Sequence, residues 1–173
     1  NGDAAFEIGE MMRKKVIPAK NASEIEMFYK RAADFGNPAA IKKYAFMKYY
    51  SNSNRRKEIE MAIKYFEKGS EIGDPELMYL WSLRKEIGRD TSKDVKEAMK
   101  LMELSANCGY PEAKVDYGIH LLNGINVTKN VAAAIRQFKE AANNSNNHEA
   151  FLYHAITLLN SSKDCNDGDS PDI

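Results

Sequence analysis

Apolar and polar residues alternate along this chain with the period of amphipathic helices, most clearly between Gly109 and Ala142. The first half of that stretch places four residues on one helical face, namely Ala113, Tyr117, Gly118 and Leu121. The second half has the same spacing at Ala134, Phe138, Ala141 and Ala142. Between the halves stand the loop-forming residues Gly124, Asn126 and Asn130. The pattern predicts two helices joined by a loop.

Gly118 indicates how closely these two helices approach. A glycine inside a helix costs about 1 kcal/mol relative to alanine. Its place in an otherwise good helical pattern indicates close packing, because a larger side chain there would push the two backbones apart. We therefore expect the facing helix to lie against Gly118.

The same kinds of helix-boundary residue recur along the chain at a regular spacing. Gly36, Gly73 and Gly109 are 37 and 36 residues apart. Two residues after each glycine comes a proline, and nine residues after it comes a small residue, namely Ala45, Ser82 or Gly118. A glycine that ends one helix and a proline in the first turn of the next are the expected boundary residues. Agreement of independent positions across several copies predicts a tandem repeat of helix pairs.

The predicted elements follow from this register. We expect helices over residues 3–15, 23–35, 38–50, 55–72, 75–88 and 92–108, then the pair within 109–142 and a last helix over 148–160. Ser23 and Glu26 fit a capping box at the second helix, and Cys108 is expected to be buried. Residues 1–160 are predicted to form one solenoid of about four repeats plus a final helix. Residues 161–173 are acidic and lack apolar periodicity, which predicts a flexible tail.

The repeat resembles the Sel1-like repeat, a relative of the tetratricopeptide repeat. The match is carried by Ala113, Tyr117, Gly118, Leu121, Gly124, Val127, Asn130, Ala134, Phe138, Ala141 and Ala142. The resemblance covers nearly the whole chain and implies an all-α fold, an α-solenoid of antiparallel helix pairs. It also implies use as an adaptor or scaffold, and it supplies no shared catalytic motif.

Composition and charge narrow the possible partners. The chain has 173 residues and a formal net charge of zero, so it has no global field that would attract nucleic acid or an anionic membrane. No apolar run has the length of a membrane span, so we expect no membrane insertion. The two cysteines make no disulfide framework. Because Asn1 begins inside a repeat, we interpret the chain as part of a longer protein.

Candidate chemistry is sparse. The three histidines, His120, His148 and His154, lack the spacing of a helical metal site. The run Asp164–Asp172 has an acidic composition, but its glycine is misplaced for a calcium loop. No phosphate-binding glycine loop and no nucleophile–base set is present. We therefore expect a protein that is not an enzyme, with no catalytic residue, no metal and no cofactor.

Four N-x-S/T sequons bear on the compartment, at Asn21, Asn126, Asn143 and Asn160. Several fall in predicted loops, as glycosylation requires, but a chain rich in asparagine produces sequons by chance. We expect a cytoplasmic protein, with a secretory or lumenal setting as the alternative.

The resemblance also implies where a partner binds. In solenoids of this class the first helix of each pair lines the concave face, and the related repeats present residues at fixed offsets from the small residue of that helix. Those offsets select Phe6, Arg13, Lys42, Phe46, Tyr49, Tyr50, Tyr79, Leu83, Val115, Ile119 and Leu122. The set is rich in apolar and aromatic side chains, which are common binding anchors. The alternative is that these side chains pack between neighbouring first helices.

These observations predict an adaptor that binds a protein or a peptide segment in its concave groove. Two other interpretations remain open. The chain could be the non-catalytic, regulatory part of a larger signalling enzyme, or a structural solenoid that forms homo-oligomers through its uncapped ends.

Overall fold

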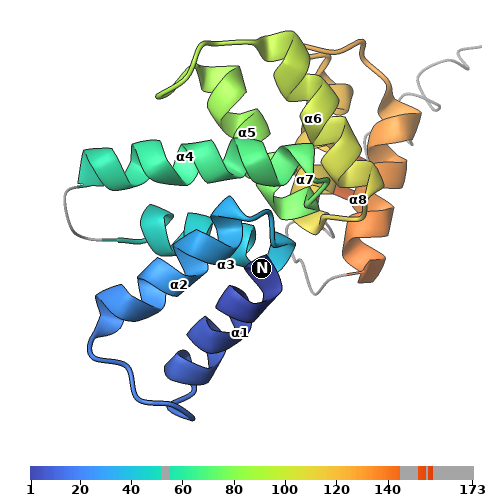
Figure 1. Ribbon diagram of the computed structural model, residues 1–173. Coiled ribbons are helices and arrows are strands. Elements are labelled where there is room, and N and C mark those ends of the chain that lie inside the picture. The colour runs from blue at the N-terminus through green and yellow to red at the C-terminus, as the bar shows by residue number, and fades with distance from the viewer. Residues whose placement is uncertain (52–54, 145–151, 155, 158–173) are drawn as a thin grey trace, which may run out of the picture.

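The computed structural model describes residues 1–51, 55–144, 152–154 and 156–157 (Figure 1). Within these residues the regular secondary structure is entirely helical. The helices are α1 (Gly2–Arg13), α2 (Ala22–Asp34), α3 (Pro38–Tyr49), α4 (Arg55–Glu71), α5 (Pro75–Ile87), α6 (Val95–Asn107), α7 (Pro111–Asn123) and α8 (Val131–Asn144).

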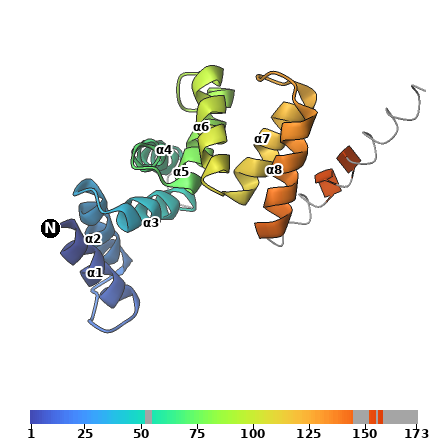
Figure 2. The same ribbon diagram turned by 90° about the vertical axis from the view of Figure 1, so that its right-hand side faces the viewer.

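Consecutive helices pack against each other along the whole described chain. The pairs α1–α2, α3–α4, α5–α6 and α7–α8 form the repeats, and α2–α3, α4–α5 and α6–α7 join one repeat to the next. Figure 2 shows the pairs following one another from α1 and α2 at one end to α7 and α8 at the other. The predicted α-solenoid of antiparallel helix pairs is confirmed.

Glycine and proline mark the boundaries where the sequence predicted them. Gly36, Gly73 and Gly109 follow the second helices with φ of 86°, 85° and 94°. This left-handed conformation is open to glycine at little cost, and it turns the chain away from the helix axis. The next helix then begins at a proline, which needs no N–H partner in a first turn.

Most predicted helix ends are correct to within two residues, and the differences come from capping. The second helix begins at Ala22, because the side chain of Asn21 accepts a hydrogen bond of 3.0 Å from the N–H of Glu24. The predicted capping box at Ser23 was therefore wrong. Asp94 caps α6 in the same way, by accepting from the N–H of Glu97 at 3.0 Å, so α6 begins three residues later than predicted.

The predictions for Cys108 and for the C-terminal residues have different outcomes. Cys108 is exposed rather than buried, because it is the C-cap residue directly after the last residue of α6. Of the predicted last helix, residues 152–154 and 156–157 are helical. The remainder of that helix and the predicted acidic tail at 161–173 lie outside the described residues.

Gly118 packs as its sequence position predicted. A Cβ atom added to Gly118 would lie 2.5 Å from Cε1 of Phe138 on α8. The first repeat uses the same combination, since a Cβ on Gly9 would lie 3.0 Å from Cε1 of Tyr29. Glycine in the first helix thus makes room for an aromatic ring of the second helix, and each ring is buried.

A second close approach joins neighbouring repeats. A Cβ on Gly69 of α4 would lie 2.8 Å from the Cβ of Leu77 on α5. The equivalent positions carry Ala32 with Ala40 at one joint and Ser105 with Ala113 at another, and all four are fully buried. The larger Leu77 is therefore accommodated by the loss of a side chain at Gly69.

Candidate binding surface on the first helices

The predicted partner-binding residues differ widely in exposure. Tyr50 has 70% of its surface exposed, and Arg13 is also exposed. Most of the others are partly buried, namely Phe6, Lys42, Phe46, Tyr49, Tyr79, Leu83, Ile119 and Leu122. Val115 is only 3% exposed and packs with Ala141 and Ala142 of α8. Its selection as a surface residue was wrong, because α8 covers that side of α7.

Three of the predicted residues form an aromatic cluster at the end of α3, which we define as Phe46, Tyr49, Tyr50 and the underlying Phe66 of α4. The ring centroids of Tyr49 and Tyr50 are 5.1 Å apart, and those of Phe46 and Tyr50 are 5.9 Å apart. Phe66 is fully buried and lies 5.5 Å from Tyr49. The buried ring contacts Phe46 and Tyr49, and these two rings in turn contact the exposed Tyr50.

Tyr79 belongs to a second aromatic contact. Its ring centroid lies 5.4 Å from that of Tyr110, just before α7. Its hydroxyl donates a hydrogen bond of 2.7 Å to Asp116 of α7. Burial, with this hydrogen bond and the charge of Asp116, raises the pKa of Tyr79. The hydroxyl therefore has a partner within the chain.

Similar polar links join each first helix to the next. Lys42 of α3 lies 2.8 Å from Glu76 and 3.3 Å from Asp74 at the start of α5. Farther along, Arg84 of α5 donates to Tyr49, and Glu86 of α5 lies 3.5 Å from His120 of α7. Of the predicted residues, these links involve Lys42, Tyr49 and Tyr79. The side chains serve the joints between repeats as well as the surface.

Lys42 illustrates the electrostatic balance of such a link. Burial acts to lower the pKa of its ammonium group, but the hydrogen bond to Glu76 and the charges of Asp74 and Glu76 outweigh burial and raise that pKa. Lys42 stays charged and is already occupied by two carboxylates. It offers little free charge to a partner.

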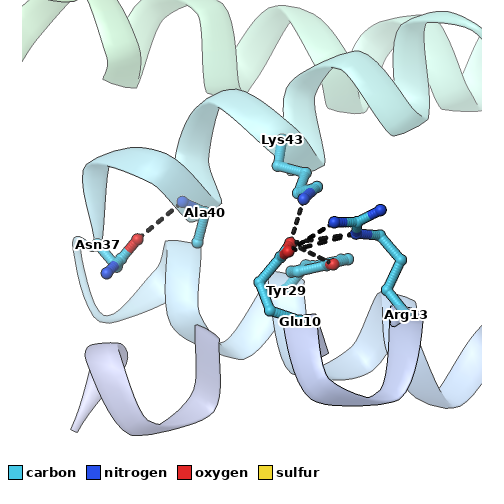
Figure 3. Close-up of polar contacts among 6 residues, drawn as sticks. All are labelled: Glu10, Arg13, Tyr29, Asn37, Ala40 and Lys43. Carbon is cyan, nitrogen blue, oxygen red and sulfur yellow. Dashed lines mark hydrogen bonds and ion pairs between the residues drawn. The ribbon is translucent and has the colours of Figure 1, made fainter. Parts of the chain in front are cut away.

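Arg13 is also engaged within the chain (Figure 3). Its Nη2 lies 2.8 Å from Oε2 of Glu10, whose carboxylate also accepts a hydrogen bond of 2.7 Å from the Tyr29 hydroxyl and one from Lys43. Glu10 is 9% exposed. The hydrogen bond from Arg13, followed by those from Lys43 and Tyr29, lowers the pKa of Glu10 to about 2 despite its burial. This group ties α1, α2 and α3 together.

Next to the aromatic cluster lies a basic hollow, which we call the arginine pocket. It has a volume of about 420 Å³ and is lined by Tyr49, Arg55, Arg56, Ile59, Arg84, Arg89 and Asp90. The lining comes from the end of α3, the start of α4, the end of α5 and the loop after it. Sequence reasoning missed the four arginines, because none occupies a selected offset. The one available signal concerned Arg84, which stands 35 residues after Tyr49, close to the repeat length.

The described residues contain neither a metal site nor a membrane span. No three His, Cys, Asp or Glu side chains among them gather closely enough to hold a metal ion. None of the helices in that part of the chain combines the length and apolar character needed to cross a bilayer.

Comparison with solved structures finds the same architecture. A Sel1 repeat protein from Oxalobacter formigenes superposes with a TM-score of 0.71 at 25% identity, over 89% of this chain and 62% of that one. A protective antigen present in uropathogenic Escherichia coli strains, which displays an SLR fold, has a TM-score of 0.63 at 19% identity, over 92% of this chain and 42% of that one. This chain thus spans less than two thirds of either protein. No curated protein sequence matches it significantly.

The family assignment rests on the repeats themselves. The Sel1 repeat family model matches residues 38–74, 75–110 and 111–146, more than half of the chain. Its boundaries at Pro38, Pro75 and Pro111 are those that the glycine–proline register predicted. The helices α1 and α2 lie outside the matched ranges and pack as a further pair. With its repeat register, helix pairing and structural neighbours in agreement, this chain belongs to the Sel1 repeat family.

Proposed function

We propose that this chain is a non-catalytic scaffold that binds a protein or peptide segment on the surface formed by its first helices. Sel1 repeat proteins generally mediate protein–protein interaction, which supports the class of function. The location is supported by Tyr50 and Ile87, which are 70% and 68% exposed at the ends of α3 and α5.

These two residues occupy equivalent positions in successive repeats, 37 residues apart. An exposed large apolar side chain that recurs on one face is a typical anchor for a partner. The rings of Phe46 and Tyr49 hold Tyr50 in place, which lowers the entropy that binding would have to remove. This recurring exposure is the observation that carries the proposal.

A comparative pull-down tests it. The double variant Tyr50→Ser with Ile87→Ser should lose a protein that the wild-type chain retains from lysate of its source cells. The control is Phe35→Ser with Ile72→Ser, which removes two apolar side chains that are 61% and 45% exposed just past the ends of the second helices α2 and α4. The control should keep the partner. Loss of the same protein from both variants would place the site elsewhere.

A further inference from the structure

We infer that the arginine pocket binds an anionic side chain of the partner, so that the ligand is an acidic peptide segment whose apolar residues lie on the neighbouring aromatic cluster. This inference rests on the proposed function and adds the chemistry of the partner. It is carried by the charge balance of the pocket, by the position of Arg84 and by the contact between the pocket and the exposed aromatic rings.

The pocket concentrates positive charge in a chain whose formal net charge is zero. Four arginines line it, and Asp90 is the one acidic side chain among the described residues of the lining. Arg56 lies 3.3 Å from Glu60 in a pair that is largely solvent-exposed, and such pairs contribute little. In the described part of the chain, Arg55, Arg84 and Arg89 form no ion pair with a carboxylate. The pocket therefore has an excess of cationic donors.

Arg84 departs from the way this chain treats its other partly buried cations. Five partly or fully buried lysines form ion pairs with carboxylates, namely Lys42, Lys43, Lys48, Lys85 and Lys114. Lys68 donates instead to carbonyl oxygens at the end of α2. Arg84 instead donates from Nη2 to the neutral Tyr49 hydroxyl at 3.1 Å. A partly buried charge without a counterion is costly, and an anionic ligand would supply the missing counterion.

The guanidinium of Arg84 is also held in position for binding. Its Cζ lies 5.5 Å from the centroid of the Tyr49 ring, so the ring face and the hydroxyl both restrain it. A guanidinium has five N–H donors in a planar fork that suits carboxylate and phosphate oxygens. Because one donor serves Tyr49, the rest remain for a ligand.

The adjoining surface favours a peptide over a free anion. Tyr49 lines the pocket and is in contact with Tyr50, whose ring is mostly exposed. A volume of about 420 Å³ admits a side chain of Glu or phosphoserine, while an apolar neighbour in the same peptide would reach Tyr50. Arginine clusters are typical of acidic-motif recognition, and aromatic side chains are common binding anchors.

Fluorescence anisotropy with two matched peptides tests the inference. One fluorescein-labelled peptide alternates Glu with Leu, and the other carries Gln in place of each Glu. The acidic peptide should bind the wild-type chain at least about tenfold more tightly than its neutral counterpart, a difference of about 1.4 kcal/mol. A third peptide with phosphoserine at the central Glu shows whether phosphate or carboxylate is the preferred anion.

Charge-matched variants distinguish binding in the arginine pocket from general electrostatic attraction between the chain and an acidic peptide. Arg84→Gln with Arg89→Gln should weaken the acidic peptide at least about tenfold, whereas Lys100→Gln with Arg136→Gln, two exposed cations on α6 and α8, should change its affinity less than about twofold. If the Arg84 change impairs folding, the single variant Arg89→Gln, at an exposed position, tests the pocket in its place. Thermal melts verify each variant.

Three results would overturn the inference. They are equal binding of the Glu and Gln peptides, equal weakening by both double variants, and displacement of the peptide by a single-stranded oligothymidine that binds more tightly through the same arginines. The proposed function fails separately. If the pull-down partner is lost with Tyr50→Ser and Ile87→Ser but kept with the two arginine substitutions, the scaffold function stands and the acidic ligand does not.

Discussion

Glu10 shows how one residue organises the first repeat. Its carboxylate accepts hydrogen bonds from Arg13, Tyr29 and Lys43, which come from α1, α2 and α3. Its role could not be predicted from sequence, because two of its three donors, Tyr29 and Lys43, reach it only through the fold. The offset rule placed Arg13 on the binding surface, whereas the structure shows it held by Glu10.

The pKa of Glu10 leads to a pH-dependent prediction. Because the folded-state pKa is about 2 rather than the usual 4.5, the stabilising contribution is present above about pH 4.5 and is lost as the pH falls toward 2. Glu10→Gln should lower the free energy of unfolding by about 1–3 kcal/mol at pH 7. The gap to wild type should shrink at pH 3, as measured by urea denaturation.

Glu7→Gln provides the control for that measurement. Glu7 is exposed on the same helix and undergoes the same loss of charge, so its stability should change by less than about 0.5 kcal/mol. A Glu10→Gln deficit that stays constant from pH 7 to pH 3 would show that the carboxylate charge of Glu10 does not stabilise the fold.

Helix pairing was largely predictable at the scale of elements, because glycine, proline and small residues recur at fixed positions. Gly118 was identified correctly from sequence, since a glycine in a helix interior is costly unless close packing requires it. The joint between Gly69 and Leu77 was not identified. Its identification requires two observations. Leu77 stands where the other repeats have Ala40 and Ala113, and the residue that compensates for its size, Gly69, lies on a different helix.

This compensation predicts a coupled pair of substitutions. Gly69→Ala should cost about 1–3 kcal/mol, because its methyl group would overlap Leu77. Leu77→Ala should cost about 2–5 kcal/mol by leaving a cavity. The double variant restores the alanine pair found at Ala32 and Ala40, so its cost should fall short of the sum by about 1 kcal/mol or more.

Denaturant unfolding of the wild type, both single variants and the double variant gives the coupling energy. The cycle at Ser105→Gly and Ala113→Ser, at the next joint along, serves as a comparison without a bulky partner. Strict additivity at Gly69 and Leu77 would mean that the two helices adjust their separation freely, and that Gly69 does not compensate for the size of Leu77.

At the scale of the whole molecule, the solenoid and its family followed from the sequence, but the binding surface followed only in part. The offset rule found Tyr50, yet it also selected Val115, which α8 buries. It passed over the arginine pocket, whose lining comes from α3, α4, α5 and the loop after α5. A surface assembled across repeats depends on how one repeat is set against the next, and the residue pattern within a single repeat does not encode that relation.

If a partner contacts the ends of the first helices, site-specific photo-crosslinking is the most direct way to detect it. A benzophenone amino acid at Tyr50, compared with the same group at Phe35 on the end of α2, probes two aromatic positions that are 70% and 61% exposed. In the source cells, we expect a covalent protein adduct from position 50 and none from position 35. An adduct from position 35 alone would contradict a site on the first helices and assign binding to the second helices.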